Sequence, residues 1–352
     1  MNICIVTYYR NENPGSVLQA YALQLVLKND GHNIVFYRNT ISSHTVRHLL
    51  LRIVNSIIRC RIYNAKLFFS KYILFSKAHH LLNEIHKDNL SKSDINCYIL
   101  GSDVIWSMEH QPLKKRLPFF GYPFVGTKII SYAVSAANTT SERFTQIGLI
   151  PGSLNHISSL SVRDQHTKDI VQPLTETPIA LVCDPTLLLS TKDYQIFEKT
   201  APSIGSYIVL YLFEGLSDQM INNLQTFARQ TNRKIVSLSL NDYADIMLPC
   251  DPWNFITYYK HADYIITDTF HGTLFSIIFE RQFLSVQCGK NKVNDLLGRL
   301  LLTDRIFHDN DELLLSLEKP IDWSVPNRIL DELREQSLQF LSVALKNINI
   351  DS

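Results

Sequence analysis

His271 is the residue of this chain whose type and setting most favour chemistry. It precedes Gly272 at the point where a predicted buried strand, residues 262–266, gives way to a predicted helix. Open α/β sheets bind ligands beyond the carboxyl ends of their strands, and the N–H groups at the start of the next helix suit an anion. An imidazole beside the N–H groups of Gly272 and Thr273 could therefore serve acid–base chemistry on a phosphate or a carboxylate. Taken alone, a histidine in such a place is more often simply packed or exposed.

Polar side chains follow other predicted strands as well. Ser102 and Asp103 come directly after the apolar run at residues 97–100, and Arg163 follows the run at residues 158–162. A carboxylate at a sheet edge could act as a base or hold a hydroxyl, and an arginine could hold a phosphate or carboxylate through two hydrogen bonds. A turn role for Asp103 and a surface ion pair for Arg163 fit the same pattern.

The first predicted strand, residues 3–8, runs into a polar loop that contains Asn13, Gly15 and Ser16. Ser16 is a suitable N-cap for a predicted helix at residues 17–27. A glycine in the first turn of a βαβ unit is typical of a phosphate or sugar loop. The GxGxxG pattern is absent from this turn, which disfavours dinucleotide binding.

Strand and helix patterns alternate along the 352 residues and predict an α/β protein of two domains with a cleft between them. The polar, mixed segment at residues 190–205 marks the predicted boundary, with residues 1–198 in the first domain and residues 199–326 in the second. An amphipathic helix at residues 327–346 is expected to pack back on the first domain.

Residues 41–90 form a predicted helical insertion with a one-sided charge pattern. Residues 41–80 contain seven lysines and arginines and no acidic residue, interleaved with apolar side chains at helical spacing. Such a stretch is typical of a surface that rests on anionic lipid or on a lipid-linked substrate. It is equally typical of a helical hairpin that packs on its domain and leaves a basic face in water.

The composition indicates an ordinary globular protein. With 45% hydrophobic and 19% charged residues and a net charge of +1, the chain does not have the basic excess of a nucleic-acid-binding protein. Its six cysteines are widely spaced without a CxxC pair, which favours free thiols in a reducing compartment. We find no signal peptide and no apolar run long enough for a spanning helix, so the chain is predicted to be cytoplasmic. His44 and His48 share a helix face but lack further ligands nearby, and no metal site is expected.

Six motifs occur along the chain: NPGSVLQAYAL at residues 13–23, GSDVIW at 101–106, SYAVS at 131–135, SVRD at 161–164, DPTLL at 184–188 and TDTFHGT at 267–273. Taken together and in this order, they resemble the polysaccharide pyruvyl transferase family. The resemblance implies a glycosyltransferase-B-like fold of two Rossmann-like domains that face a cleft. It also implies transfer of pyruvate from phosphoenolpyruvate to a sugar, usually as a cyclic ketal, with release of phosphate.

The resemblance also implies roles for individual residues. His271 would be the general acid that protonates the vinyl carbon of phosphoenolpyruvate, and Arg163 would bind its carboxylate or phosphate. Asp103 would be the base or would hold the acceptor hydroxyl. The remaining expected substrate-binding residues are Asn13, Gly15, Ser16, Ser102, Gly272, Thr273, Arg299 and Arg305.

The expected partners are phosphoenolpyruvate and a glycan or lipid-linked saccharide acceptor for a cell-surface polysaccharide, with peripheral contact at the inner face of the membrane and no nucleic acid. No cofactor or metal is expected, because the donor is already activated. Two alternatives stay open on the same fold. One is a nucleotide-sugar-dependent glycosyltransferase, for which Glu280 is the candidate carboxylate, and the other is a non-catalytic glycan-binding protein.

Overall fold

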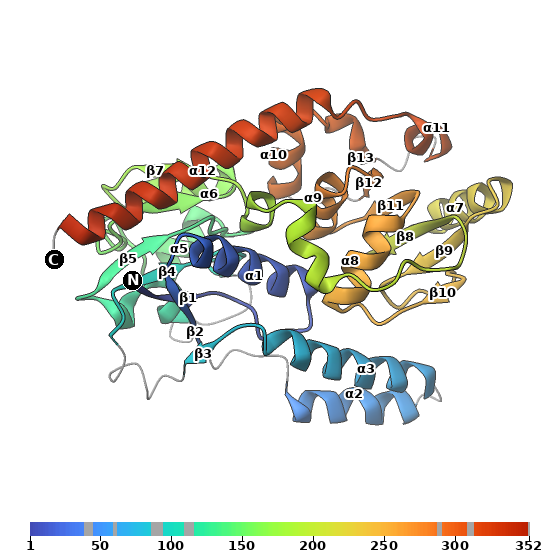
Figure 1. Cartoon of the computed structure of the whole chain (residues 1–352), viewed down its shortest axis with the longest axis horizontal. Helices are drawn as coiled ribbons and strands as arrows, with labels where there is room; N and C mark the ends of the chain where they lie inside the picture. The colour runs from blue at the N-terminus through green and yellow to red at the C-terminus, as the bar shows by residue number, and fades with distance from the viewer. Residues whose placement is uncertain are drawn as a thin grey trace.

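The structure is a computed structural model, and it describes residues 1–38, 45–58, 62–85, 94–108, 116–286, 291–307 and 313–350. Parts of the predicted insertion at residues 41–90, together with His44, Cys60 and Cys288, lie outside these ranges. The described residues build two parallel sheets with helices packed on them, and the last helix runs back along the molecule from the second sheet to the first (Figure 1).

The first sheet belongs to the first half of the chain. Its strands are β1 (Asn2–Val6), β2 (Asn33–Tyr37), β3 (Glu84–Ile85), β4 (Cys97–Leu100) and β5 (Lys128–Ser131). They lie in the order β3-β2-β1-β4-β5, and each neighbouring pair is parallel. Two further parallel strands, β6 (Leu160–Val162) and β7 (Ile179–Leu181), continue this sheet through a bridge between Ile130 and Ser159.

The second sheet is also parallel and has the order β10-β9-β8-β11-β12-β13. Its strands are β8 (Tyr207–Tyr211), β9 (Lys234–Ser237), β10 (Ile246–Met247), β11 (Tyr264–Thr267), β12 (Gln282–Val286) and β13 (Ile306–Phe307). Because neighbouring strands are parallel, their carboxyl ends meet along one edge of each sheet.

The strands are apolar on both faces because helices cover both faces. In β1, Ile3 and Ile5 pack into one buried cluster with Leu23, whereas Cys4 and Val6 pack into another on the opposite face of the sheet. This alternation explains why the sequence shows near-continuous apolar runs instead of a pattern with period two.

The helices connect and cover the strands. They are α1 (Pro14–Asn29), α2 (Val46–Ile58), α3 (Ile62–His79), α5 (Ser141–Gln146), α6 (Gln165–Val171), α7 (Asp218–Gln230), α8 (Pro252–His261), α9 (Phe270–Ile278), α10 (Asn291–Arg299), α11 (Leu313–Glu318) and α12 (Ser324–Ile350). Short 3-10 turns are η2 (Leu117–Phe120), η3 (Tyr122–Phe124), η4 (Gln172–Leu174), η5 (Pro185–Leu188), η6 (Thr191–Phe197) and η7 (Thr303–Arg305).

Helix α1 begins earlier than the sequence predicts. Its N-cap is Asn13, whose side chain accepts a hydrogen bond from the N–H of Gly15 at 2.9 Å, and Pro14 occupies the first helical position. Proline is favoured there because its missing N–H would have no partner in the helix. The prediction that Ser16 is the N-cap is therefore wrong, and the Ser16 hydroxyl is left available for a longer-range contact.

The connection between the sheets is more ordered than a polar linker. Within the segment predicted to mark the boundary, η6 buries Tyr194 and Phe197 in the core of the second half of the molecule. Helix α12 starts near the second sheet and ends against the first, where Leu341 and Leu345 join the cluster that contains Ile3. Figure 1 shows this long helix passing along both halves of the molecule.

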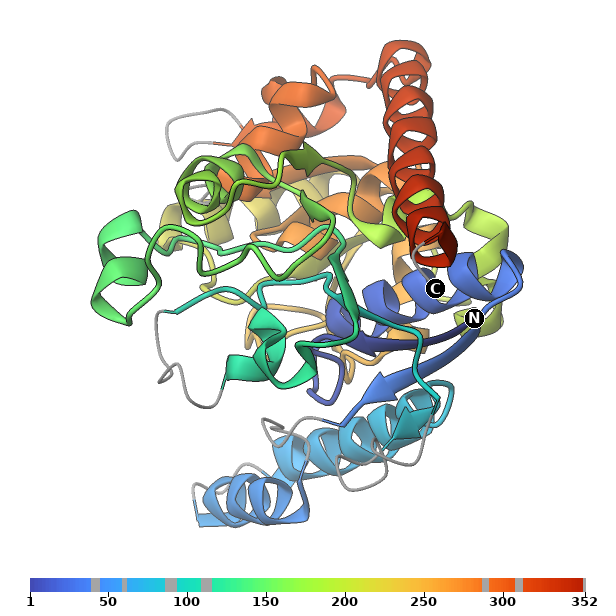
Figure 2. The same ribbon diagram turned by 90° about the vertical axis from the view of Figure 1, so that its left-hand side faces the viewer.

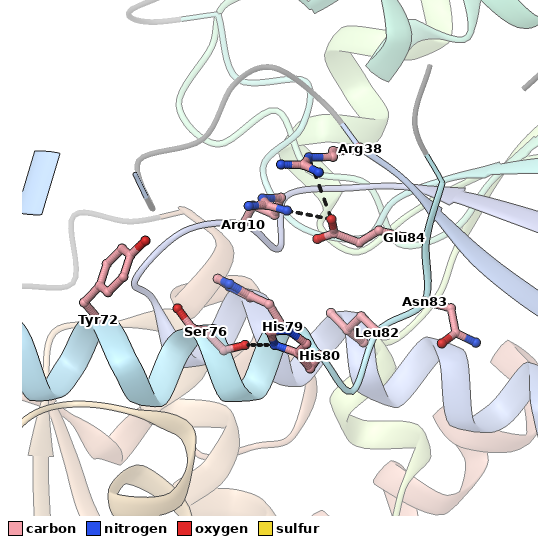
Figure 3. Close-up of a pocket in the computed structure, with 9 residues that line it drawn as sticks. All are labelled: Arg10, Arg38, Tyr72, Ser76, His79, His80, Leu82, Asn83 and Glu84. Atoms are coloured by element: carbon pink, nitrogen blue, oxygen red, sulfur yellow. Dashed lines mark hydrogen bonds and ion pairs between the residues drawn. The ribbon is translucent and has the colours of Figure 1, made fainter. Parts of the chain in front are cut away.

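Helices α2 and α3 form a hairpin that extends from the first half of the molecule, with α2 on the outer side in both views (Figures 1 and 2). At its base, Glu84 of β3 accepts a hydrogen bond from Arg10 at 2.6 Å and pairs with Arg38 at 3.8 Å. Figure 3 shows both arginines directed at this carboxylate, in a cavity of 450 Å³ that His79 also lines. These ion pairs fasten the end of the hairpin to the loops that follow β1 and β2.

Cys4, Cys97, Cys183 and Cys250 are free and buried in the described part of the chain. Burial raises the pKa of each of these thiols, for Cys97 to about 12, so they are protonated and unreactive at neutral pH. Among the described helices, none combines the length and the apolar content that a transmembrane span requires.

Candidate functional site

Segments that follow strands of both sheets line one cavity of 290 Å³. The first half of the chain contributes Asn13 from the loop after β1 and Asp103 from the loop after β4. The second half contributes Tyr211 at the end of β8, His271 after β11 and Lys292 after β12. The cavity thus lies where the carboxyl edges of the two sheets meet, and its lining residues are up to 284 positions apart in the sequence (Tyr8 to Lys292).

His271 is the second residue of α9 and is 7% exposed. The side chain of Thr269 caps this helix by accepting a hydrogen bond from the N–H of Gly272 at 2.9 Å, and the Thr269 hydroxyl also contacts that of Thr267 at 2.9 Å. This pair of threonines fixes the turn between β11 and α9. The imidazole therefore projects from a rigid strand-to-helix junction, as the sequence pattern predicts.

Gly15 allows α1 to approach the imidazole closely. A Cβ atom at this position would lie 2.3 Å from Cγ and Nδ1 of His271, which is far inside van der Waals contact. The absence of a side chain at Gly15 thus brings the start of α1 against the ring of His271. The glycine predicted from the first βα turn serves this contact between the two halves of the molecule.

We expect Gly15→Ala to lower the free energy of unfolding by about 1–3 kcal/mol, because the new methyl group must push His271 or α1 aside. Urea denaturation measures this loss. Gly298→Ala is the matched control, since Gly298 is also helical and a Cβ there meets nothing within 4 Å. Equal stability of Gly15→Ala and wild type would contradict the contact.

Asp184 joins the buried polar groups behind the cavity. Its Oδ2 accepts a hydrogen bond from Arg163 at 2.6 Å and one from the Ser102 hydroxyl at 3.3 Å, and it lies 3.9 Å from Nε2 of His271. Its Oδ1 accepts hydrogen bonds from the N–H and the hydroxyl of Thr186. Asp184 is the first residue of the DPTLL motif and was not among the predicted site residues. An aspartate directly after an apolar strand was the signal that it belongs to the site.

Arg163 lies deeper than the sequence predicts. Its guanidinium is bound to Asp184, lies 3.5 Å from Asp103 and stacks on Phe270 with 4.3 Å between Cζ and the ring centroid. The side chain is 1% exposed and does not line the cavity. In this structure Arg163 is placed to hold the two carboxylates and Phe270 in position, not to grip a ligand directly.

Asp103 lines the cavity from the opposite sheet. It accepts hydrogen bonds from the Ser16 hydroxyl at 2.8 Å and from the N–H of Val104 at 2.8 Å. Burial by itself would raise the pKa of this carboxyl group, but the charge of Arg163, assisted by His271 and the Ser16 hydroxyl, outweighs burial and lowers the pKa. Asp103 is therefore ionised at neutral pH, which is the state that a base or a hydroxyl-binding group requires.

The pKa of His271 is lowered below its ordinary value of about 6.5. Burial is the largest cause, and the nearby carboxylates of Asp184 and Asp103 oppose it only in part. The Nε2 atom has no hydrogen-bond partner among the described residues. The imidazole is consequently neutral at pH 7 without a ligand, and an anion bound beside it would favour its protonated form.

We expect the His271 titration, followed by NMR of histidine-labelled protein, to have its midpoint below pH 6.5. Because a neighbouring anion stabilises the imidazolium, phosphate or a phosphorylated ligand in the cavity should move this midpoint upward. The His271→Gln protein identifies the resonance by its absence. An unchanged midpoint in the presence of an anion that does bind would contradict the placement of the anion beside the imidazole.

The N–H groups of Gly272 and Thr273 were predicted to donate hydrogen bonds to an anion, but both already donate within the helix. The Gly272 N–H is bound by the Thr269 hydroxyl, and the Thr273 N–H is bound by the Thr269 carbonyl at 3.0 Å. The Thr273 hydroxyl contacts Ser285 at 2.6 Å inside the core. The first turn of α9 keeps only the N–H groups of Phe270 and His271 without a hydrogen bond to the described residues. Helix capping explains the difference, since a strand-end threonine satisfies the third N–H of the helix.

Lys292 lines the cavity but was not among the predicted substrate-binding residues. Its Nζ lies 5.5 Å from the centroid of the Phe270 ring, which the Arg163 guanidinium and the His271 imidazole also contact. Its place in the first turn of α10, the first helix after β12, was the available signal. Arg299 and Arg305 were predicted instead, but neither lines the cavity. Arg299 pairs with Asp295 at 3.8 Å, and Arg305 is buried against Asp304 and the carbonyl of Ser316.

Within the described ranges, no three histidine, cysteine, aspartate or glutamate side chains are arranged to hold a metal ion. The polar groups around the cavity are instead organised for protons and hydrogen bonds. A buried imidazole, an ionised carboxylate and an ammonium group face one small space, which suits proton transfer to and from a small anionic ligand.

Solved structures resemble the whole chain in fold. The UDP-GlcNAc 2-epimerase of Methanocaldococcus jannaschii is 12% identical with a TM-score of 0.56, and the alignment covers 95% of this chain and 100% of that one. The Neisseria meningitidis UDP-GlcNAc 2-epimerase bound to UDP-GlcNAc is 9% identical with a TM-score of 0.53, covering 99% and 100%. Identities this low show the fold alone. The fold is thus of the glycosyltransferase-B type with two Rossmann-like domains, which confirms the predicted fold class.

At the level of sequence, no curated protein matches the chain. A family model does: the one described as polysaccharide pyruvyl transferase matches residues 13–289. This range includes Gly15, Asp103, Asp184 and His271, and it covers most of the 352 residues. The chain belongs to the polysaccharide pyruvyl transferase family.

Proposed function

We propose that the protein transfers the pyruvate group of phosphoenolpyruvate to a sugar of a cell-surface polysaccharide or of its lipid-linked precursor, forming a pyruvate ketal and releasing phosphate. One observation carries the proposal. His271 and Asp103, an imidazole and an ionised carboxylate from opposite halves of the molecule, face the same cavity together with Lys292. Family membership supports transfer to a polysaccharide in general.

The size of the cavity favours a small donor. Its 290 Å³ lies at the lower end of the roughly 300–1,000 Å³ that small-molecule pockets span. A three-carbon phosphate fits this space better than a nucleotide sugar does. Lys292 and the N–H groups of Phe270 and His271 supply positive charge for the phosphate and carboxylate of the donor.

The proposed chemistry uses the two titratable groups in turn. His271, protonated once the anionic donor is bound, gives its proton to the vinyl carbon, and an oxocarbenium-like centre forms at the neighbouring carbon. A sugar hydroxyl attacks this centre while Asp103 accepts the hydroxyl proton. A second hydroxyl then replaces phosphate at the same carbon, and its proton returns to His271. Asp103 passes its own proton to the departing phosphate, so both groups return to their starting states.

A larger groove of 550 Å³ adjoins the cavity and is our proposed acceptor site. The two spaces share Tyr211 and Phe213 as lining residues. Glu214 and Asn241 line the groove from the second half of the molecule, and Phe68 lines it from α3. Carboxylate, amide and aromatic side chains are groups that can bind sugar hydroxyls and sugar faces.

The inner face of the α2–α3 hairpin borders this groove and is held there by an ion pair with the loop after β1. The Arg52 guanidinium is bound to the carboxylate of Glu12 and lies over the Phe68 ring, 3.9 Å from its centroid. Both arginine and glutamate line the groove. The hairpin therefore forms one wall of the proposed acceptor site.

The alternative glycosyltransferase activity finds less support. Glu280, its candidate carboxylate, accepts a hydrogen bond from Asn327 at 2.8 Å and lines neither the cavity nor the groove. A nucleotide sugar would have to occupy the larger groove. The two activities can therefore be distinguished by which ligand, phosphoenolpyruvate or a nucleotide sugar, stabilises the protein against unfolding.

Phosphate release from phosphoenolpyruvate, measured with a panel of lipid-linked and aryl glycosides, tests the proposed function. We expect release that depends on the glycoside and is lost in the Lys292→Ala protein at donor concentrations that saturate the wild type. Thermal shift supplies the second readout. Stabilisation by a nucleotide sugar, with none by phosphoenolpyruvate, would replace this proposal by the glycosyltransferase.

A further inference from the structure

The outer face of the α2–α3 hairpin carries apolar side chains that nothing in the described structure covers. Helix α2 packs mainly on α3, and α3 in turn contacts α8 of the second half of the molecule. Eight large apolar residues on these two helices are at least 50% exposed. They are Val46, Leu50, Leu51, Val54, Ile57 and Ile58 of α2, and Phe69 and Ile73 of α3.

These side chains form a continuous stripe along α2. Val46, Leu50, Val54 and Ile58 recur every four residues and therefore lie on one side of the helix. Exposed apolar stripes of this kind mark a surface that binds a partner or a membrane. Figures 1 and 2 both show α2 on the side of the hairpin that faces away from the two sheets.

The positive charge of the hairpin indicates that its binding partner is a negatively charged surface. No acidic residue occurs between Asp30 and Glu84, and Arg47 of α2 and Lys66 of α3 are exposed. A second copy of the hairpin would bring these like charges together, which disfavours self-association through this face. A surface that is negative outside and apolar beneath complements both features, and an anionic lipid bilayer has this composition.

We propose that the outer face of the hairpin lies on an anionic membrane surface, with the apolar stripe of α2 in the interfacial layer and the basic side chains at the headgroups. The opposite side of the same hairpin, with Arg52 and Phe68, walls the proposed acceptor groove. Docking by this face would hold the groove beside the membrane, where a lipid-linked saccharide resides. Only this last consequence rests on the proposed function, because lipid binding does not depend on the transfer reaction.

Vesicle co-sedimentation of the full chain tests the proposal without any assay of activity. We expect binding to vesicles of phosphatidylcholine and phosphatidylglycerol in equal parts, little binding to phosphatidylcholine alone, and weakening by added salt. The triple variant Leu50→Gln, Val54→Gln, Ile58→Gln should lower the partition coefficient by about tenfold or more. The double variant Arg47→Glu, Lys66→Glu should do the same through charge.

Matched controls distinguish binding through this face from non-specific binding through apolar or basic side chains elsewhere on the protein. The triple variant Val125→Gln, Ile150→Gln, Ile196→Gln removes equally exposed apolar side chains from other elements, and it should bind as the wild type does. The double variant Lys192→Glu, Lys234→Glu makes the same change in net charge elsewhere. Thermal unfolding confirms that all variants are folded.

Three outcomes would overturn the proposal. One is absence of binding to anionic vesicles, and another is equal binding to neutral and anionic ones. The third is a dimer in sedimentation velocity that the α2 variant dissociates, which would assign the face to a second copy of this chain. Failure of the transfer assay with intact vesicle binding would instead reject the proposed function and leave the membrane surface in place.

Discussion

Replacing His271 by glutamine is expected to lower kcat for glycoside-dependent phosphate release by about 10²–10⁴-fold, the usual contribution of a general acid or base. Glutamine keeps a polar side chain of similar length but cannot give a proton to the vinyl carbon. Because Nε2 of His271 has no hydrogen-bond partner among the described residues, the loss should fall on turnover more than on stability. Initial-rate kinetics at saturating phosphoenolpyruvate, together with urea denaturation, separate these two effects.

His261→Gln is the matched control for this substitution. His261 also lies in a helix of the second half of the molecule, but it pairs with Glu198 at 3.2 Å and does not line the cavity. Its replacement should leave kcat unchanged. Turnover of His271→Gln within tenfold of the wild type would remove His271 from the proposed role.

Asp184→Ala is expected to lower the free energy of unfolding by about 3–5 kcal/mol, because it leaves the Arg163 guanidinium buried with only a long contact to Asp103. The Ser102 and Thr186 hydroxyls lose their acceptor as well. Urea denaturation measures the loss. Asp331→Ala breaks the exposed ion pair with Arg334 and should cost less than about 1 kcal/mol.

The double variant Arg163→Met, Asp184→Leu tests whether the Arg163–Asp184 pair contributes to turnover by holding the neighbouring site residues in position. Replacing both charges by apolar side chains removes the unpaired buried charge, so at least part of the lost stability should return. Turnover should not return, because Asp103, Phe270 and His271 lose the groups that hold them. Recovery of both stability and turnover would show that Arg163 and Asp184 are dispensable for the reaction.

Much of the fold could be predicted from local patterns. The buried parallel strands appear as apolar runs, and turn residues such as Asp184 with Pro185 mark where they end. Parallel strands place their carboxyl ends along one edge, and this rule is enough to bring His271 to a ligand-binding edge. The strand before His271 and the helix after it follow from sequence because they depend on neighbours along the chain.

The pairing of side chains within the site could not be predicted in the same way. Arg163 and Asp184 stand 21 residues apart, and Ser16 and Asp103 stand 87 apart, so no local pattern connects them. Arg163 was therefore expected to contact the ligand, whereas it is buried between two carboxylates and holds them in position. Lys292 takes the place at the cavity that was expected of an arginine.

Backbone donors were also beyond local reasoning. The N–H groups of Gly272 and Thr273 were expected to bind an anion because they stand at the start of a helix. Instead, Thr269 accepts a hydrogen bond from each of them. Ser16 looked like a cap, yet Asn13 caps α1 and frees the serine hydroxyl for Asp103. In each instance several residues near the helix start can serve as the cap, and only the three-dimensional packing selects one.

The most direct test of the proposed transfer is the reaction of phosphoenolpyruvate with an accepted glycoside in heavy water, analysed by mass spectrometry and NMR. We expect one phosphate to be released for each ketal formed, and the ketal methyl group to carry a single deuterium delivered through His271. His271→Gln should form almost none of this product. Consumption of a nucleotide sugar, with phosphoenolpyruvate unchanged in the presence of every glycoside, would contradict the proposed transfer of pyruvate.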